Sequence, residues 1–517
     1  MTPDVVTSET VSDAADLARG SSVSLLGSVA GALLSMALIY VVTSGLGADN
    51  GGVFFEAIAF FNIAIVAVAI GADTGLLRFT SRSLALTEGP GPNQLLIVGL
   101  GPVLIVGVVV AVTGAILAPT LGEALGGDDH AAAVTTMLRV LSCFIPIGAL
   151  NLAVLGATRG YGTMLPTVAT ERIGRPALQL ALVGSAVLLG VSAGWLAALW
   201  ALAFLLAYLV AVFWLRRLRV TQPQRSRRLV PLVETAREFW GFTLPRALAS
   251  MFRVGVLWLD VLLVGALMSP RDAAIYTVAT RLIQAGFLAT DAIGQAVEPM
   301  FSSLLARGHA DRTHNVYQVA TAWLISLTWP AFLGAWIFAP GILGVFGSDF
   351  EEAAPVVAIL AGSALLGSSF GSIDVLLVMA GKSIWSLWNS AASLVANVVL
   401  NLILIPSMGL NGAALAWAIS RVIANVLPFL EMRSLLGINP FGRRWWTAVG
   451  ASVGTFGLIG LALRLTLGSG IGVIALYVVS AGAAYAALVW RWRHQLDLSA
   501  FAGLLRRRIG AVDGAGQ

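Results

Sequence analysis

Charged residues are scarce in this chain. They make up 11% of its 517 residues, whereas 58% of the residues are hydrophobic. A soluble globular domain carries about 25% charged residues. The shortage therefore excludes an ordinary soluble fold and indicates an all-α protein that crosses a membrane many times.

Cysteine and histidine are nearly absent as well. Cys143 is the only cysteine, which excludes an intramolecular disulfide and a thiolate metal site. The four histidines fall in predicted loops or tails, and none is paired at ligand spacing on a helix; they are His130, His309, His314 and His494. We therefore expect neither a metal nor another cofactor.

The first 20 residues lack the apolar core of a signal peptide. They carry four acidic residues instead, Asp4, Glu9, Asp13 and Asp16, so we expect the first apolar span to remain as a helix. The formal net charge of +5 does not indicate nucleic acid as a partner, because the arginines fall in short loops between apolar spans.

Long apolar runs are abundant in the chain, and a helix of about 20 mostly apolar residues crosses a bilayer. We predict fourteen spans, at roughly residues 22–43, 52–72, 94–116, 133–157, 176–193, 195–215, 241–267, 273–299, 318–339, 355–380, 384–405, 411–433, 446–464 and 470–490. Arginines gather in every second loop, and those loops are cytoplasmic by the positive-inside rule. The even number of spans then places both termini in the cytoplasm.

The spans divide into two bundles of six. Residues 158–180 align without gaps on residues 380–402, and the same offset of 222 pairs Phe79 with Phe301. Six spans separate the copies, so both point the same way, as in parallel-repeat transporters; chance similarity between apolar helices is the alternative. The predicted segments are an N-terminal segment 1–21, a first bundle 22–215, an Arg-rich linker 216–240, a second bundle 241–433, spans thirteen and fourteen at 446–490 and a basic tail 491–517.

The stretch 397–420 reads NVVLNLILIPSMGLNGAALAWAIS. With the fourteen-span layout, it resembles the polysaccharide and oligosaccharide flippases of the multidrug/oligosaccharidyl-lipid/polysaccharide exporter superfamily. The stretches WLDVLLVGALMSPRDAAIYTVATRLI and SVAGALLSMALIYVVTSGLGADNGGVFF are similar to the family's seventh-to-eighth and first hairpins. The resemblance implies a non-enzymatic, monomeric flippase in the inner or plasma membrane. It would move polyprenyl-linked saccharides outward by alternating access. The partners that the resemblance implies are membrane lipids and the glycosyltransferases or polymerase of the same pathway.

Two spans carry charged stripes, and such charges mark functional sites by default. Arg246, Arg253 and Asp260 stand seven residues apart, on one helix face. The next span carries Arg281 and Asp291. We predict a structural ion pair between Asp260 and Arg281, and we expect Arg253, with Arg246 as its inner companion, to bind the pyrophosphate of the substrate bidentately. Pairing of Arg253 with Asp291 is the alternative.

Five further polar residues lie within predicted spans. Glu56 and Asp374, together with Asp291, are candidates for ion coupling; solvation at the outer interface is the alternative for Glu56. Asn397, Asn401 and Arg421 are candidates for substrate binding, and packing between helices is the alternative for the two asparagines. Gly381-Lys382-Ser383 ends like a phosphate-binding loop but sits in a turn between helices, so we expect a gradient, not ATP hydrolysis, to drive transport.

Other functions remain open. A drug or cation exporter on the same architecture needs a carboxylate in the first bundle, and the first span has no charge. A lipid II flippase uses early arginines, which are also missing. A membrane glycosyltransferase or polymerase needs a large outer loop with acidic residues, and the outer loops here are short. A non-transporting scaffold for assembly enzymes is compatible with the sequence.

Overall fold

The computed structural model describes residues 3–85, 90–221 and 231–492. Within these ranges the chain is helical and holds no strand. Ten helical stretches there are long and apolar enough to cross a membrane, and two of them, Gly27–Leu84 and Pro92–Gly160, each contain two predicted spans. The predicted all-α membrane fold is confirmed. Of the basic tail predicted at residues 491–517, only residues 491 and 492 are among the described residues.

The first half of the chain folds into long, kinked helices. Spans one and two form α1, which turns at Gly47 (φ 75°), and spans three and four form α3, which turns at Gly127 (φ 56°). A positive φ is open to glycine without a steric penalty, so these residues allow hairpins without a long loop. The helices are α1 (Pro3–Ala69), α2 (Ala72–Ala85), α3 (Pro92–Gly160), α4 (Leu165–Thr167), a π-helical segment (Val168–Gly174), α5 (Arg175–Leu188) and α6 (Ala193–Thr221).

The second half is more often interrupted. Span eight is broken at Phe287 between two helices, and span ten is broken at residues 369–372. The helices are α7 (Leu232–Leu267), α8 (Pro270–Gly286), α9 (Leu288–Ala306), α10 (Ala310–Leu343), two 3₁₀ turns (Gly344–Phe346 and Ser348–Ala353), α11 (Ala354–Ser368), α12 (Ile373–Met379), α13 (Ser383–Met408) and α14 (Leu410–Leu436). The last two spans are α15 (Arg443–Ser452), a π-helical turn (Val453–Gly457) and α16 (Leu458–Leu467), followed by α17 (Ile471–Arg491).

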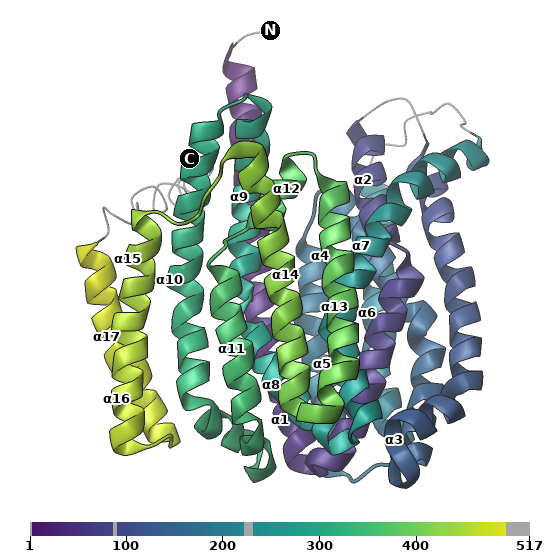
Figure 1. Ribbon diagram of the computed structural model, residues 1–517. Helices are drawn as coiled ribbons and strands as arrows, with labels where there is room; N and C mark the ends of the chain where they lie inside the picture. Colours follow the sequence, from purple (N-terminus) through teal and green to yellow (C-terminus); the bar gives the residue numbers. More distant parts are fainter. Residues whose placement is uncertain (1–2, 86–89, 222–230, 493–517) are drawn as a thin grey trace.

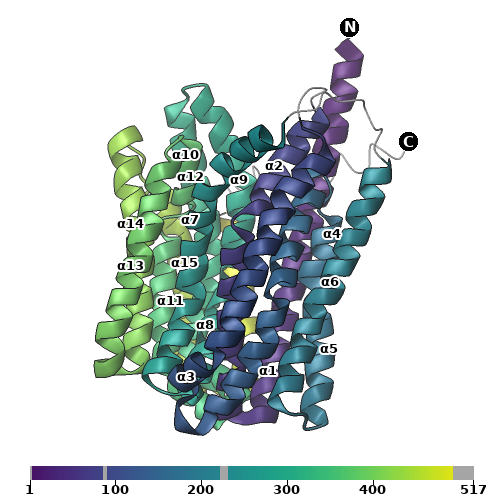
Figure 2. The same ribbon diagram turned by 90° about the vertical axis from the view of Figure 1, so that its right-hand side faces the viewer.

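The helices stand roughly side by side, with α15 to α17 at one edge of the molecule beside α10 (Figure 1). Tyr477 of α17 packs its ring on Phe338 of α10, with 4.7 Å between the ring centroids. Figure 2 shows the helices of the first half gathered on the other side of the molecule. The two halves meet where α1 packs on α7 and α8. There Gly52 lies so close to Pro270 that an added Cβ would stand 1.6 Å from the Pro270 carbonyl oxygen.

Helix α7 joins the two bundles. Its first turns pack on the first bundle, where Phe239 is fully buried and its ring centroid lies 5.3 Å from that of Phe79 in α2. Its later turns pack on α13 of the second bundle. The predicted linker 216–240 is therefore mostly helix: α6 runs to Thr221 and α7 begins at Leu232, while residues 222–230 lie outside the described residues.

Candidate functional site

The second bundle contains a polar cavity of about 320 Å³. It lies between α9, α12, α13 and α14. Three carboxylates and one guanidinium line it, those of Asp291, Glu298, Asp374 and Arg421. The uncharged polar side chains of the lining are Thr290, Ser372, Asn389, Ser390 and Asn425. Such a concentration of polar groups in an apolar bundle is a candidate binding site.

The two helix breaks build the walls of this cavity. After the break at Phe287, the first turn of α9 presents Thr290 and Asp291. After the break at residues 369–372, the first residues of α12 bring Ser372 and Asp374 to the opposite wall. Irregular backbone at membrane depth is tolerated where it lines a polar cavity. The polar cavity therefore accounts for the two helix breaks, and the breaks in turn bring polar side chains to its walls.

Two polar side chains of the lining, Asp374 and Asn389, have defined hydrogen-bond partners. Ser386 donates to Asp374 Oδ1 at 2.6 Å, and Asn389 Nδ2 donates to Glu431 at 2.8 Å. By contrast, the hydroxyls of Ser372 and Thr290 are buried and have no hydrogen-bond partner among the described residues. A buried hydroxyl without a partner costs free energy. These two hydroxyls are therefore ready to bond a polar ligand in the cavity.

Arg421 and Asp291 form the charged centre of the cavity. The charge of Asp291 interacts with that of Arg421 and with that of Arg172, which comes from the first bundle. The Arg421 guanidinium lies over the Phe287 ring, 5.0 Å from its centroid. Two cations thus act on the charge of Asp291, and one of them belongs to the other bundle.

Three residues predicted separately come together here. Arg421 was expected to bind substrate, and Asp291 and Asp374 to couple ions; all three line the same cavity. Arg246 and Arg253 do not line it. Both are exposed on α7, where Arg246 lies over the Phe242 ring and Arg253 donates to Ser250 Oγ at 3.1 Å.

The predicted ion pair between Asp260 and Arg281 is wrong. Asp260 accepts hydrogen bonds from Asn401 at 2.8 Å and from the Tyr276 hydroxyl at 3.1 Å. Arg281 instead stacks on Trp258, 3.6 Å from the ring centroid, and donates to Gln284. Equal depth along two helices had suggested the pair, but depth does not fix the direction in which each side chain points around its helix.

Asn397 and Asn401 occupy a packed joint and do not line the cavity. Both are fully buried on α13, and Asn401 is bonded to Asp260 of α7. Substrate contact, one of the two expectations for these asparagines, does not fit this position. The alternative expectation, a polar contact between helices, fits Asn401.

Glu56 lies at the contact between the two bundles. Its side chain is fully buried, and neither carboxylate oxygen has a hydrogen-bond partner among the described residues. An added Cβ on Gly265 of α7 would stand 2.1 Å from Glu56 Oε1. Solvation at the outer interface is therefore excluded for Glu56 in this conformation. Its predicted role in ion coupling stays a prediction.

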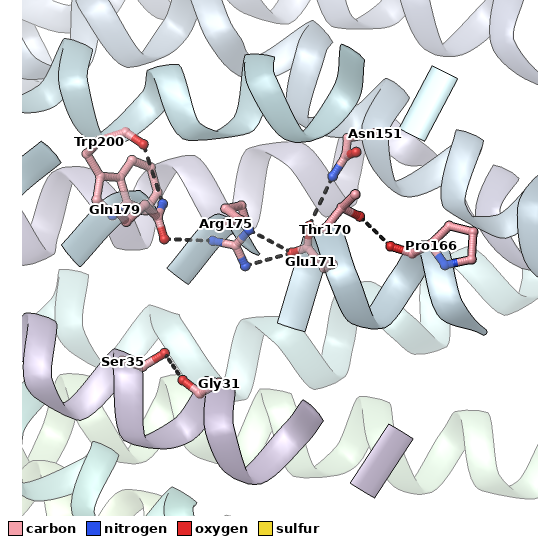
Figure 3. A network of polar contacts seen from close by, with 9 residues as sticks. All are labelled: Gly31, Ser35, Asn151, Pro166, Thr170, Glu171, Arg175, Gln179 and Trp200. Carbon is pink, nitrogen blue, oxygen red and sulfur yellow. Dashed lines mark hydrogen bonds and ion pairs between the residues drawn. The ribbon is translucent and has the colours of Figure 1, made fainter. Parts of the chain in front are cut away.

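A polar network in the first bundle was missed by the sequence reasoning (Figure 3). Glu171 accepts hydrogen bonds from Asn151 at 3.0 Å and from Arg175 Nε at 2.9 Å. Arg175 also donates to Gln179 at 3.1 Å, and Gln179 donates to the Trp200 carbonyl. We had expected the fifth span to begin at residue 176, so these charges were assigned to a loop. The π-helical segment extends the helix to include them.

Arg172 belongs to the same π-helical segment. Its Nη1 donates to the Ser28 hydroxyl of α1, and its backbone carbonyl lies against Gly31, where an added Cβ would stand 2.4 Å from the oxygen. Because Gly31 has no side chain, the backbone of Arg172 can pack directly against α1. The signal available in the sequence was the pair Gly27 and Gly31, a close-packing motif whose partner helix the sequence does not identify.

The chain forms bundles of membrane-spanning helices, and the second bundle contains the polar cavity. Residues 245–403 match the MatE family. Over 441 residues the chain is 26% identical to the probable low-salt glycan biosynthesis flippase Agl15 of Haloferax volcanii, covering 85% of this chain and 88% of that protein. It is also 26% identical over 213 residues to the probable flippase AglR of the same organism, which covers 40% of this chain and 42% of that protein.

Solved structures share the fold. The lipid II flippase MurJ in an inward closed conformation matches with a TM-score of 0.69 at 12% identity, covering 91% of this chain and 99% of that one. An inward-facing multidrug resistance MATE family transporter matches with a TM-score of 0.67 at 18% identity, covering 79% and 94%. The predicted resemblance to flippases of the exporter superfamily is confirmed by the two Haloferax volcanii relatives, and the chain is a multi-pass membrane protein.

Proposed function

We propose that this protein is a flippase that moves polyprenyl-linked oligosaccharide or polysaccharide precursors from the inner to the outer leaflet for cell-surface glycan assembly. The polar cavity in the second bundle is the observation that carries this proposal. A lipid-linked saccharide has a polar head group that needs such a cavity and a hydrocarbon tail that stays in the bilayer. The relation to a glycan biosynthesis flippase over most of both chains supports it.

The mechanism would be alternating access between the two bundles. The saccharide head group enters the cavity, and rocking of the bundles transfers it to the other side. Arg421 is positioned to hold the pyrophosphate, since a guanidinium bonds such a group bidentately. The exposed guanidiniums of Arg253 and Arg246 on α7 remain proposed contacts at the entrance. The protein performs no covalent chemistry in this scheme.

A gradient would supply the energy, with Glu56 as the proposed coupling group. A carboxylate without partners at the contact between bundles carries less desolvation cost when neutral. An imposed proton or sodium gradient across vesicles should change the exchange rate of the parent protein, whereas Glu56→Gln should remove that response. The orientation with both termini in the cytoplasm, and the plasma or inner membrane as the location, belong to the same proposal.

Leaflet exchange in reconstituted vesicles tests the function. The full-length protein is placed in vesicles with a fluorescent polyprenyl-diphosphate sugar, and the fraction reachable by an added membrane-impermeant quencher is followed over time. Faster exchange than in protein-free vesicles supports a flippase. No acceleration, with protein correctly inserted, would leave a scaffold as the explanation.

A drug exporter is the second candidate, because the structure shares its fold with a multidrug transporter. Efflux of cationic dyes from the same vesicles distinguishes the two candidates. A lipid II flippase is distinguished by presenting lipid II as the exchanged lipid. Preference for the polyprenyl-diphosphate sugar over both compounds would support the first candidate.

A further inference from the structure

We propose that the cavity of the second bundle is a saccharide subsite that accepts uncharged or amino-bearing sugars and disfavours sugars with a carboxylate, such as uronic acids. This inference rests on the proposed flippase function and adds a preference for substrate charge. Its basis is the charge and hydrogen-bonding capacity of the cavity lining.

The charge of the lining is unbalanced. Asp291, Glu298 and Asp374 contribute three carboxylates, and Arg421 contributes the one cation among the described residues that line the cavity. The charge of Arg421 acts on Asp291, which leaves Glu298 and Asp374 without an ion-pair partner within 4 Å among the described residues. A uronic acid placed beside these two groups would be repelled, whereas an ammonium group would be attracted.

The hydrogen-bonding groups of the lining match a sugar. Carboxylates accept hydrogen bonds from sugar hydroxyls, and the unpartnered hydroxyls of Ser372 and Thr290 can both donate and accept. Ser372 is only 7% exposed, so its hydroxyl cannot be satisfied by bulk water. A sugar ring carries several hydroxyls, so it can form hydrogen bonds with these carboxylates and hydroxyls at the same time.

The arrangement does not suit a bare metal ion. Among the described residues no group of three or more aspartate, glutamate, histidine or cysteine side chains is placed to hold one. The carboxylates are instead spread around a space of about 320 Å³, at the lower end of the roughly 300–1,000 Å³ of small-molecule pockets. That space admits a short saccharide.

The test compares two probes in vesicles that contain the full-length protein. One is a polyprenyl diphosphate carrying N-acetylglucosamine, and the other is the same carrier with glucuronic acid. The parent protein should exchange the first faster. Asp374→Asn and Glu298→Gln should each lower the ratio of the two rates by about fivefold, the factor for one charge pair at contact distance in water. Glu123→Gln, an exposed carboxylate of α3 outside the cavity, should leave the ratio unchanged.

The outcomes separate this inference from the flippase function. Exchange of neither probe by the parent protein would overturn the proposed function itself. Exchange of both probes at equal rates, or a ratio that stays the same in both cavity variants, would overturn the charge preference and leave the function standing. Glu298 is exposed, so its substitution tests the idea even if Asp374→Asn, which loses the carboxylate bonded by Ser386, folds poorly.

Discussion

Asn401 of α13 donates a 2.8 Å hydrogen bond to the carboxylate of Asp260 in α7, and both side chains are buried. The second carboxylate oxygen accepts from Tyr276 of α8. One carboxylate thus joins three helices, α7, α8 and α13. Each of the two donors also has a backbone acceptor. Asn401 donates to the Asn397 carbonyl at 2.9 Å, and Tyr276 donates to the Ala413 carbonyl at 3.5 Å.

Asp260→Ala should therefore destabilise the protein. It would leave the Asn401 amide and the Tyr276 hydroxyl with only their backbone acceptors. The expected cost is about 1.5–3 kcal/mol, the range for hydrogen bonds to a charged group. Membrane proteins fall toward the low end of such values. Thermal unfolding of the purified protein in detergent measures the change.

Arg281→Ala is the matched comparison. If Asp260 were held by an ion pair, removal of Arg281 would destabilise the protein as much as removal of Asp260. The structure gives Arg281 only a stacking contact with Trp258 and a bond to Gln284, so its loss should cost less. Equal losses in the two variants would contradict the hydrogen-bonded joint.

Arg421→Ala should slow leaflet exchange more than Arg253→Ala does. Arg421 lines the cavity and Arg253 does not, and loss of a charge-assisted hydrogen bond of about 1.5–3 kcal/mol corresponds to roughly ten- to a hundredfold in rate. Arg421→Lys keeps the charge but loses the bidentate geometry, so it should fall between the two. Protein abundance in the membrane is the control, and an unimpaired Arg421→Ala variant would remove Arg421 from substrate binding.

Gly265→Ala should open the contact between the bundles. Its Cβ would stand 2.1 Å from Glu56 Oε1, so either the Glu56 side chain or the contact between α1 and α7 must shift. Labelling of a cysteine placed at Val264, which is buried next to Gly265 in α7, should become faster in a background where Cys143 is serine. The added substitution Glu56→Ala frees the space and should restore slow labelling.

Gly472→Ala provides the control for this experiment, because a Cβ there meets nothing within 4 Å. It should label like the parent. If Gly265→Ala also labels like the parent, the packing of Glu56 against Gly265 does not hold the two bundles together.

The sequence predicted the class of fold because apolar run length and arginine position are local signals. It identified Arg421, Asp291 and Asp374 as unusual because charge in an apolar span is costly. It could not show that these three share one cavity, since that depends on the breaks at Phe287 and at residues 369–372. Neither break contains a proline that would have revealed it. The Asp260–Arg281 pair failed because rotation about the helix axis decides which neighbour a side chain meets.

The network of Figure 3 supports a last prediction. Arg175 neutralises Glu171 across 2.6 Å and lies over the Phe204 ring. Among the described residues, Arg175→Ala leaves that carboxylate with only the Asn151 amide, whereas the double substitution Glu171→Gln with Arg175→Gln removes both charges. The single variant should therefore lose more thermal stability than the double variant, because one unpaired charge in a bundle costs more than a neutral pair. Unfolding midpoints in detergent measure both, and a double variant less stable than the single one would show that the network contributes through packing and not through charge.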